Sequence, residues 1–355
     1  MDKIKVLFHT QPNITSFNAQ DLNGREIASR LNEDLFEIYF LDVLHTEIDS
    51  RLLKDNIKIF KVSKNKFKRK WDIFKYKLLH KYDISFYVRV FKQEGYFLKL
   101  LKLFDKNRKT IHMVENRLPY PADEEYNKQA KYNALHSNYI FPISKQVQKD
   151  VEQFYNIKGD GIIHVGVDTS LFTPNFNKKN NLLKIISCGT FQARKQPLLF
   201  AEIAKYYPNC DFYWIGEGEL KNEVQHKKEQ EKIDNLYLLN NMRHKELSKF
   251  MANSDIFLFP SIHEGFPKVI VETMASGLPV IAFDKYGPEA IINNKTGFIV
   301  HSKEEMIIKL KILIEDESLR EKFAVNSVKR AKEFDWNKIV LEWEKVLLKS
   351  VNSSK

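Results

Sequence analysis

Short apolar runs bounded by turn-forming residues alternate along this chain with longer segments in which apolar residues recur every three to four positions. Such short runs are typical of buried parallel strands, and the longer segments are typical of helices that cover a sheet. The pattern therefore predicts an α/β protein with doubly wound parallel sheets. The predicted strands are Ile4–His9, Phe36–Leu41, Ile57–Val62, Asp83–Val88, Thr110–Val114, Tyr139–Pro142, Gly161–Val165, Leu182–Cys188, Asp211–Ile215, Leu236–Leu239, Asp255–Phe259, Pro279–Ala282 and Gly297–Val300.

The same rhythm occurs twice, with an interruption at Leu171–Asn181, which contains a proline and a polar run without apolar period. Such a stretch marks a linker between domains. We therefore predict two Rossmann-like domains, residues 1–172 and 180–335, and assign the amphipathic C-terminal helix, 336–355, to the first. Ligands of open α/β sheets bind outside the carboxyl ends of the strands, so two such domains facing a cleft would hold a ligand between them.

Composition agrees with two folded domains. The chain has 355 residues, of which 43% are hydrophobic and 13% aromatic, enough for two packed cores. No apolar run approaches the length of a membrane span, and the start at Met1–Lys3 does not resemble a signal peptide, so we expect a cytoplasmic protein. Cys188 and Cys210 lack metal-site or redox spacing and are expected to be reduced core residues.

Charge is unevenly distributed. The formal net charge of +11 favours a negatively charged partner. Between Lys58 and Lys81 there are ten Lys or Arg residues and one acid, interleaved with aromatic side chains. This stretch, and the amphipathic Tyr96–Phe104, have two interpretations: a patch that contacts an anionic membrane surface, or helices that cover the sheet with solvated lysines. Nucleic-acid binding has no motif in its support.

The clearest candidate chemistry lies in Ser261–Glu272, which follows a predicted strand. Glu264 falls in the loop after that strand, and Glu272 falls about two turns into a helix that should begin near Pro267, where proline is well tolerated. Free N–H groups and the positive dipole end at a helix start suit a phosphate. Two flanking carboxylates can accept hydrogen bonds from sugar hydroxyls. A nucleotide sugar has such groups in the matching order: the hydroxyls of its sugar, the diphosphate, and the hydroxyls of its ribose.

A second candidate is Gly189–Lys195, GTFQARK, which follows another predicted strand. Arg194 and Lys195 are adjacent cations that could neutralise a diphosphate, with the arginine able to bind it through two parallel hydrogen bonds. The alternative is a pair of exposed cations on a basic protein.

The stretch HEGFPKVIVETMASGLPVIAFDKYGPEAIINNKTGFIV resembles the donor-binding signature of the retaining, metal-independent glycosyltransferases of the GT-B fold, the group 1 family (glycosyltransferase family 4). The shared positions are the Glu-x7-Glu pair Glu264 and Glu272, the turn Ser276–Val280, Glu289 and Thr296–Phe298. This resemblance implies the GT-B fold, with two Rossmann-like domains facing a cleft and the C-terminal helix packing back on the first.

The resemblance also implies roles for individual residues. Glu264 would contact hydroxyls of the donor sugar and Glu272 the ribose, with backbone of Gly265, Phe266 and Pro267 against sugar and diphosphate. Neither a metal nor another cofactor is expected, and no Asp-x-Asp follows a predicted strand. The full set of predicted donor-binding positions is Gly189, Arg194, Lys195, Met242, Gly265, Phe266, Pro267, Lys268 and Glu272.

The first domain departs further from the family. Many members have a Gly-Gly loop after the first strand, where this chain has Pro12–Asn18. The second domain also departs at one position, because many members have an Arg directly after the glycine of the second motif, where this chain has Thr190. Many also have a catalytic-side histidine after the strand that contains His112. Residue type favours His112, whereas position at the strand end favours Glu115, so both stay candidates.

The resemblance implies a hexosyltransferase-type enzyme that moves a sugar, with retention, from a nucleotide sugar to a glycan or lipid-linked glycan acceptor in cell-surface polysaccharide or glycolipid synthesis. Lipid-linked acceptors favour the membrane interpretation of residues 58–82, on the inner face of the cell membrane. The alternatives are a non-catalytic GT-B partner subunit of another glycosyltransferase, and a sugar-nucleotide epimerase.

Overall fold

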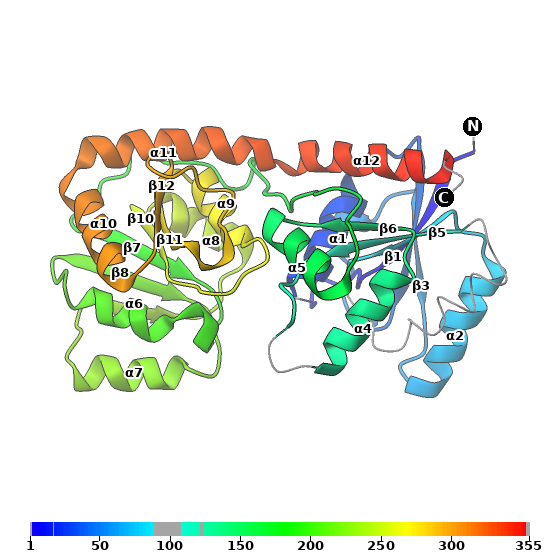
Figure 1. Ribbon diagram of the computed structural model, residues 1–355, viewed down its shortest axis with the longest axis horizontal. Coiled ribbons are helices and arrows are strands. Elements are labelled where there is room, and N and C mark those ends of the chain that lie inside the picture. The colour runs from blue at the N-terminus through cyan, green and yellow to red at the C-terminus, as the bar shows by residue number, and fades with distance from the viewer. Residues whose placement is uncertain (1, 17, 89–107, 121–123, 353–355) are drawn as a thin grey trace. The chain divides into compact units, whose positions relative to one another are not determined.

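A computed structural model describes residues 2–16, 18–88, 108–120 and 124–352 of the protein (Figure 1). The chain forms two compact units: the first consists of Met1–Val165 and Trp336–Lys355, and the second of Gly166–Asp335. The predicted segment Tyr96–Phe104 lies outside the described residues. Which unit binds donor and which binds acceptor stays a prediction.

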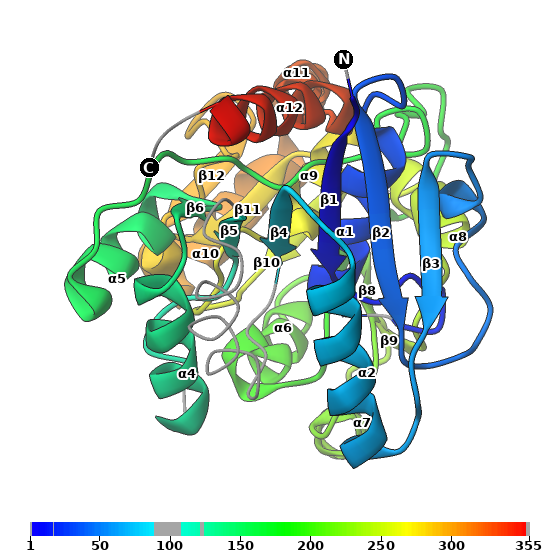
Figure 2. The same cartoon turned by 90° about the vertical axis from the view of Figure 1, so that its right-hand side faces the viewer.

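The sheet of the first unit is parallel, with strand order β3-β2-β1-β4-β5-β6 among the described residues. Figure 2 shows β1, β2 and β3 side by side. Phe8 packs against Phe40 and Phe86 on the neighbouring strands, with ring centroids 5.7 and 4.9 Å apart. The strands are β1 (Ile4–His9), β2 (Phe36–Asp42), β3 (Ile57–Lys61), β4 (Ile84–Tyr87), β5 (Lys109–Val114) and β6 (Tyr139–Pro142).

Helices surround this sheet, and several begin at side-chain caps. The Asn18 side chain accepts from the backbone of Asp21 at the start of α1, and Ser144 caps α5 in the same way. The C-terminal α12 packs on the first unit as predicted, because Trp343 contacts Phe86 and Phe141 edge-on. The helices of this unit are α1 (Ala19–Arg30), α2 (Lys66–Leu79), α4 (Glu124–Leu135), α5 (Lys145–Tyr155), α12 (Trp336–Asn352) and the 3-10 turn η1 (Ser50–Leu52).

The second unit repeats the arrangement, with parallel strand order β12-β11-β10-β7-β8-β9. Its core includes Phe200, Phe212 and Trp214, which pack edge to face. The strands are β7 (Leu183–Cys188), β8 (Cys210–Ile215), β9 (Leu236–Leu239), β10 (Ile256–Phe259), β11 (Val280–Phe283) and β12 (Gly297–Val300). The helices are α6 (Pro197–Ala204), α7 (Lys221–Gln230), α8 (His244–Ala252), α9 (Lys268–Ala275), α10 (Lys303–Glu315) and α11 (Glu317–Ala331), with 3-10 turns η2 (Ala193–Lys195), η3 (Asp284–Tyr286) and η4 (Lys332–Phe334).

One predicted strand is wrong. Gly161–Val165 forms no strand, although Ile163 and Val165 are buried. The run is joined to β6 by single bonds, such as the one from the Ile163 N–H to the Pro142 carbonyl (3.2 Å), and not by a ladder. The apolar pattern reflected burial of a connecting segment, which periodicity cannot distinguish from a short strand.

Candidate active site

Three of the predicted site residues of the second unit, Arg194, Lys195 and Glu264, gather where β7 and β10 end. The loop after β10 is joined to the 3-10 turn η2, because the Ile262 N–H donates to the Arg194 carbonyl (2.9 Å) and the Ser261 hydroxyl donates to the same oxygen (3.2 Å). These bonds bring the two sequence motifs together at the carboxyl edge of the sheet, where open α/β sheets bind ligands.

Glu264 is the centre of this group. Its Oε1 atom accepts from Lys195 Nζ (2.6 Å), from Arg194 Nη1 (3.1 Å) and from the Ser261 hydroxyl (2.5 Å). The side chain is about nine-tenths buried, yet its second oxygen, Oε2, accepts no hydrogen bond from the described residues. One carboxylate oxygen therefore fixes the side chain, and the other is left for a ligand.

The ionisation of Glu264 follows from these contacts. Burial by itself would raise the pKa of this carboxyl group, but the charges of Lys195 and Arg194, with the hydrogen bonds from Lys195 and Ser261, outweigh burial and hold the pKa below its ordinary value. Lys195 is itself buried, and its ammonium group lies 4.9 Å from the centre of the Phe259 ring. Glu264 is therefore a carboxylate at neutral pH.

The helix that follows the loop begins near Pro267, as predicted. Pro267 is the N-cap of α9, and Lys268 is the first helical residue. Glu272 is 6% exposed, and the nearest cation to it among the described residues is Lys268, 4.0 Å away. Burial and the charge of Glu272 raise the pKa of the Cys188 thiol to about 12, so this cysteine at the end of β7 stays protonated.

Glycines shape the edge between β7 and β8. A Cβ atom on Gly216 (φ +157°) would lie 2.1 Å from the Gly189 carbonyl oxygen, a clash that no rotamer relieves. Gly189 has a φ of +154°, which favours glycine, and its Cα lies beside the side chain of Lys195: a Cβ there would be in ordinary contact with Cε of the lysine, at 3.4 Å.

The remaining predicted donor-binding positions lie at different places. Gly265 and Phe266 are in the loop before α9, where the Phe266 ring packs against Phe334 (5.4 Å between centroids). Met242 is half-buried in the loop between β9 and α8, and no described contact joins it to the Glu264 group.

Two site residues were not assigned from the sequence. Ser261, fully buried, donates to Glu264, and its position three residues before the glutamate is the only sequence signal for it. Tyr286 is fully buried at the end of η3, packs edge-on against Phe259 (6.2 Å), and has its pKa raised by burial and by the charge of Glu264. Nothing in the sequence distinguishes it from a core tyrosine.

In the first unit, the two alternative candidates line one pocket. Glu115 directly follows β5, and its Oε2 accepts from Asn23 Nδ2 on α1 (3.1 Å). His112 lies within β5, is 3% exposed, and has its pKa lowered to about 4 by burial, so its imidazole is neutral. The polar residues that line this pocket, called here the β5 pocket, are Gln20, His112, Glu115, Asn116, Tyr126 and Tyr155.

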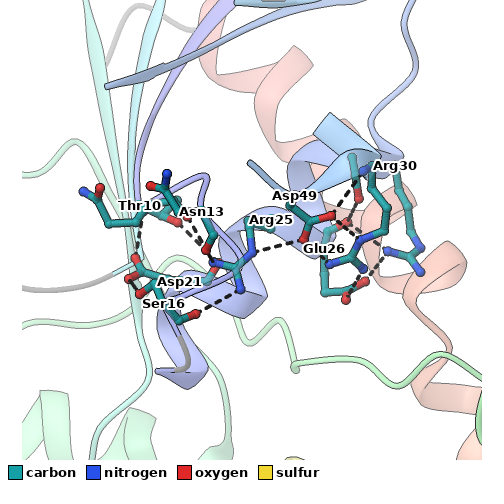
Figure 3. Close-up of polar contacts among 11 residues, drawn as sticks. Thr10, Asn13, Ser16, Asp21, Arg25, Glu26, Arg30 and Asp49 are labelled. Atoms are coloured by element: carbon teal, nitrogen blue, oxygen red, sulfur yellow. Dashed lines mark hydrogen bonds and ion pairs between the residues drawn. The ribbon is translucent and has the colours of Figure 1, made fainter. Parts of the chain in front are cut away.

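The loop after β1, which replaces the family's Gly-Gly turn, is held from beneath by a buried arginine (Figure 3). Arg25 of α1 donates to the carbonyl oxygens of Gln11 (3.1 Å), Asn13 (2.9 Å) and Ser16 (3.1 Å), and its Nε lies 3.2 Å from a carboxylate oxygen of Asp49. Three carbonyl oxygens of the loop are therefore already satisfied within the unit.

The described residues contain no cluster of three or more His, Cys, Asp or Glu side chains placed to hold a metal ion. None of the helices in the described part of the chain is long and apolar enough to cross a membrane.

The chain has two Rossmann-like units, and its structural neighbours are glycosyltransferases of the GT-B fold. The protein superposes on sucrose-phosphate synthase from Thermosynechococcus elongatus with a TM-score of 0.83, over 98% of this chain and 99% of that one, at 15% identity, a likeness of fold. Residues 169–330 match the family model for glycosyl transferases group 1. The matched residues make up nearly all of the second unit, which is therefore similar to the group 1 glycosyl transferases, in agreement with the signature.

Sequence relatives agree with this family. The chain is 33% identical over 182 residues to an uncharacterised glycosyltransferase of Methanocaldococcus jannaschii, a match to 41% of this chain and 43% of that protein. It is 31% identical over 157 residues to the UDP-Gal:alpha-D-GlcNAc-diphosphoundecaprenol alpha-1,3-galactosyltransferase of Escherichia coli, covering 39% of this chain and 40% of that enzyme. The chain thus spans less than half the length of these two relatives.

Proposed function

We propose that this protein transfers a sugar from a nucleotide sugar to an acceptor hydroxyl, with retention at the anomeric carbon and without a metal ion. The observation that carries the proposal is the difference between the two carboxylate oxygens of Glu264. Oε1 accepts from Lys195, Arg194 and Ser261, whereas Oε2 accepts no hydrogen bond from the described residues. An oriented carboxylate with one open oxygen, beside two cations, suits a sugar hydroxyl next to a diphosphate.

The remaining groups support the same placement of the donor. Lys195 and Arg194 would also donate hydrogen bonds to the diphosphate. Together with the N-terminus of α9, they would stabilise the negative charge that develops on it as the leaving group. The loop backbone at Gly265 and Phe266 would lie against the sugar and diphosphate. Glu272 is buried on α9, with its Oε1 4.0 Å from Lys268 Nζ, and would accept a hydrogen bond from a ribose hydroxyl.

The acceptor we propose is a glycan or a lipid-linked glycan, in cell-surface polysaccharide or glycolipid synthesis. The name of the E. coli relative states that it acts on a sugar linked to diphosphoundecaprenol, which supports an acceptor of this class. In the first unit, Glu115 and His112 are the proposed acceptor-side or catalytic groups, and both line the β5 pocket.

The experiment that tests the function is a panel of nucleotide sugars incubated with the protein in a buffer that contains a chelator. We expect one donor to be cleaved slowly to nucleoside diphosphate even without an acceptor, and transferred faster when a glycan acceptor is added. Retention is checked from the anomeric configuration of the product by NMR. A non-catalytic partner subunit would cleave none of the donors, and an epimerase would change the sugar without releasing the nucleotide.

Replacing Lys195 by alanine should weaken the donor complex. A hydrogen bond to a charged group contributes about 1.5–3 kcal/mol, so the dissociation constant of the donor should rise roughly tenfold to a hundredfold. Titration calorimetry with the active nucleotide sugar measures it. The matched control is Lys205→Ala, which removes a half-exposed lysine of a surface pair with Glu231 and should leave donor affinity unchanged. Equal affinities for Lys195→Ala and the wild type would remove Lys195 from the site.

For residues 58–82 we propose contact with an anionic membrane surface, which would make the enzyme peripheral on the cytoplasmic side. The support is α2, where Phe67, Trp71 and Leu78 share one helical face and are 77%, 64% and 47% exposed. Not every cation of the stretch faces outward: Lys77 is 2% exposed beside the Tyr87 hydroxyl (3.5 Å), and Lys58 pairs with Glu37. The remaining cations would meet lipid phosphates while the aromatic rings lie at headgroup depth.

Co-sedimentation with phosphatidylglycerol vesicles tests this contact. The wild type should bind at low salt and be released at high salt, because each basic residue near the surface contributes about 1 kcal/mol that salt screens. Trp71→Glu should lower the bound fraction several-fold, whereas Leu341→Glu, on an exposed position of α12, should not. A wild type that stays in the supernatant, or a Trp71→Glu variant that binds equally well, would contradict the membrane proposal.

A further inference from the structure

One arginine of α11 contacts the loop that follows η3, residues 287–296, called here the η3 loop. Arg330 donates from Nη2 to the Glu289 carbonyl (3.0 Å) and from Nε to the Ala290 carbonyl (3.2 Å). Its remaining nitrogen, Nη1, donates to Glu333 of η4. The planar fork of an arginine holds its donors in a fixed geometry, so this one side chain fixes two successive carbonyl groups of the loop.

The same arginine reaches a second loop through an aromatic ring. Its guanidinium carbon lies 4.7 Å from the centre of the Phe334 ring, and that ring packs against Phe266 with 5.4 Å between the centroids. Both aromatic side chains are buried, and a cation over a ring is attracted more strongly away from water. Phe266 lies between β10 and α9, in residues 260–267, called here the β10 loop. Phe334 therefore joins Arg330 to the loop that contains Glu264.

Both loops border the Glu264 group. Glu264 itself belongs to the β10 loop, two residues before Phe266. Tyr286, which directly precedes the η3 loop, is fully buried and packs edge-on against Phe259, the last residue of β10. Lys195 Nζ lies 4.9 Å from the centre of the same Phe259 ring and 2.6 Å from Glu264 Oε1. A shift of either loop would therefore move groups that surround the carboxylate.

The helix α11 packs alongside α9 (Figure 1) and supports the far end of the η3 loop as well. The Ser327 hydroxyl donates to the Thr296 carbonyl (3.0 Å), and Asn326 Nδ2 donates to the Lys295 carbonyl (3.1 Å). Sites that are supported from helices are held more precisely than sites that depend on loops alone. One face of α11 is thus the support on which the η3 loop rests.

We propose that Arg330 is a positioning residue of the donor site, which holds the η3 loop directly and the β10 loop through Phe334. This inference rests on the proposed glycosyl transfer and adds a residue outside the loops that meet the donor. Groups of a binding site need to be held within about 0.5 Å of their productive positions. Loss of Arg330 should therefore weaken the hold on the donor sugar, whereas the diphosphate keeps its two cations on η2.

The first measurement is backbone hydrogen exchange of the full chain without ligand, followed by mass spectrometry. Arg330→Met should speed exchange at the Ile291 N–H, which donates to the Pro288 carbonyl (3.0 Å) inside the η3 loop. It should also speed exchange in the peptide that covers residues 262–268, because the Phe334 ring loses the cation stacked on it.

Arg320→Met is the matched control for this variant. Arg320 lies on the same helix and donates from Nη1 to the Leu313 and Ile314 carbonyls (2.8 and 3.3 Å) at the end of α10. Its loss removes a comparable pair of hydrogen bonds at a different place. Exchange in the η3 and β10 loops should then keep the wild-type rate.

The second measurement is titration calorimetry with the active nucleotide sugar and with its nucleoside diphosphate. Arg330→Met should lower the preference for the nucleotide sugar over the nucleoside diphosphate about threefold to tenfold, the effect of one lost hydrogen bond. Phe334→Leu, which removes the ring between Arg330 and Phe266, should lower it in the same way. Arg330→Lys should give an intermediate preference, because lysine keeps the charge but lacks the fork that spans two carbonyl groups.

A purely structural role of Arg330 would give a different result. A variant that is only partly folded loses the same factor in affinity for both ligands, so the ratio of the two dissociation constants stays at its wild-type value. The preference therefore reports the position of the loops and not the folded fraction. Arg320→Met should keep the wild-type preference whatever it does to stability.

The proposal is overturned if Arg330→Met and Phe334→Leu both keep the wild-type preference, or if Arg320→Met loses as much of it. Unchanged exchange of both loops in Arg330→Met would overturn it as well. Failure of the proposed function is a separate result, since the wild type would then bind none of the nucleotide sugars. The donor role of Arg330 would fall with it, whereas hydrogen exchange would still decide whether Arg330 holds the two loops.

Discussion

Glu264→Gln is expected to fold normally and to lose transfer activity by about tenfold to a hundredfold in kcat/KM, or more if the carboxylate acts only in the transition state. The neutral amide keeps the shape of the side chain but removes the charge that Lys195 and Arg194 hold in place. It also turns one acceptor oxygen into a donor, so a sugar hydroxyl loses its oriented partner. Initial rates with the active donor and acceptor measure the effect.

The control for this variant is Glu231→Gln, which changes an exposed carboxylate paired with Lys205 and Lys227 on the surface of the same unit. It should retain wild-type rates, because surface pairs of this kind contribute little. Thermal unfolding of both variants separates folding from catalysis. Wild-type turnover by Glu264→Gln would remove this residue from the centre of the site.

Arg25→Met is the substitution expected to cost most in stability. It leaves three carbonyl oxygens of the loop after β1 without their donor, and it removes one of the cations next to the buried Asp49. Breaking a buried ionic interaction by deleting one partner costs about 3–5 kcal/mol, a large fraction of the roughly 5–15 kcal/mol by which a typical protein is stable. Urea unfolding followed by circular dichroism measures the change in the free energy of unfolding.

Arg30→Met is the matched control, because Arg30 lies on the same helix and pairs with Glu26 but is partly exposed. Its loss should change the free energy of unfolding by less than the loss of Arg25 does, because Glu26 keeps Arg51 as a second cation. Equal losses for the two variants would show that the buried arginine does not hold the loop after β1.

The fold, and the meeting of the two motifs of the second unit, could be predicted because their signals are local. Most predicted strands match because a buried parallel strand is a short apolar run with turn residues on both sides, and Glu264, Lys195 and Arg194 lie directly after such runs. The predicted strand Gly161–Val165 was wrong because a buried connecting segment and a paired strand have the same apolar pattern there. Local patterns therefore determine element type better than they determine pairing.

What the sequence could not show depends on contacts between distant residues. The contacts of Arg25 with Asp49 and with the carbonyl oxygens of the loop after β1 form only when the chain folds. From the sequence alone, an arginine in a helix is expected to be solvated. Lys77 was counted with the exposed cations, although it is buried beside Tyr87. Tyr155 and His112 face one pocket from α5 and β5, a juxtaposition that no spacing along the chain encodes.

The most direct test of the central claim, that Glu264 holds the sugar of a nucleotide-sugar donor, is equilibrium binding in the presence of a chelator. The active nucleotide sugar and its bare nucleoside diphosphate are titrated into the wild type and into Glu264→Gln. We predict that the wild type binds the nucleotide sugar more tightly than the nucleoside diphosphate, and that Glu264→Gln loses this preference while still binding the nucleoside diphosphate. A Glu264→Gln variant that keeps the full preference for the sugar-bearing ligand would contradict the account.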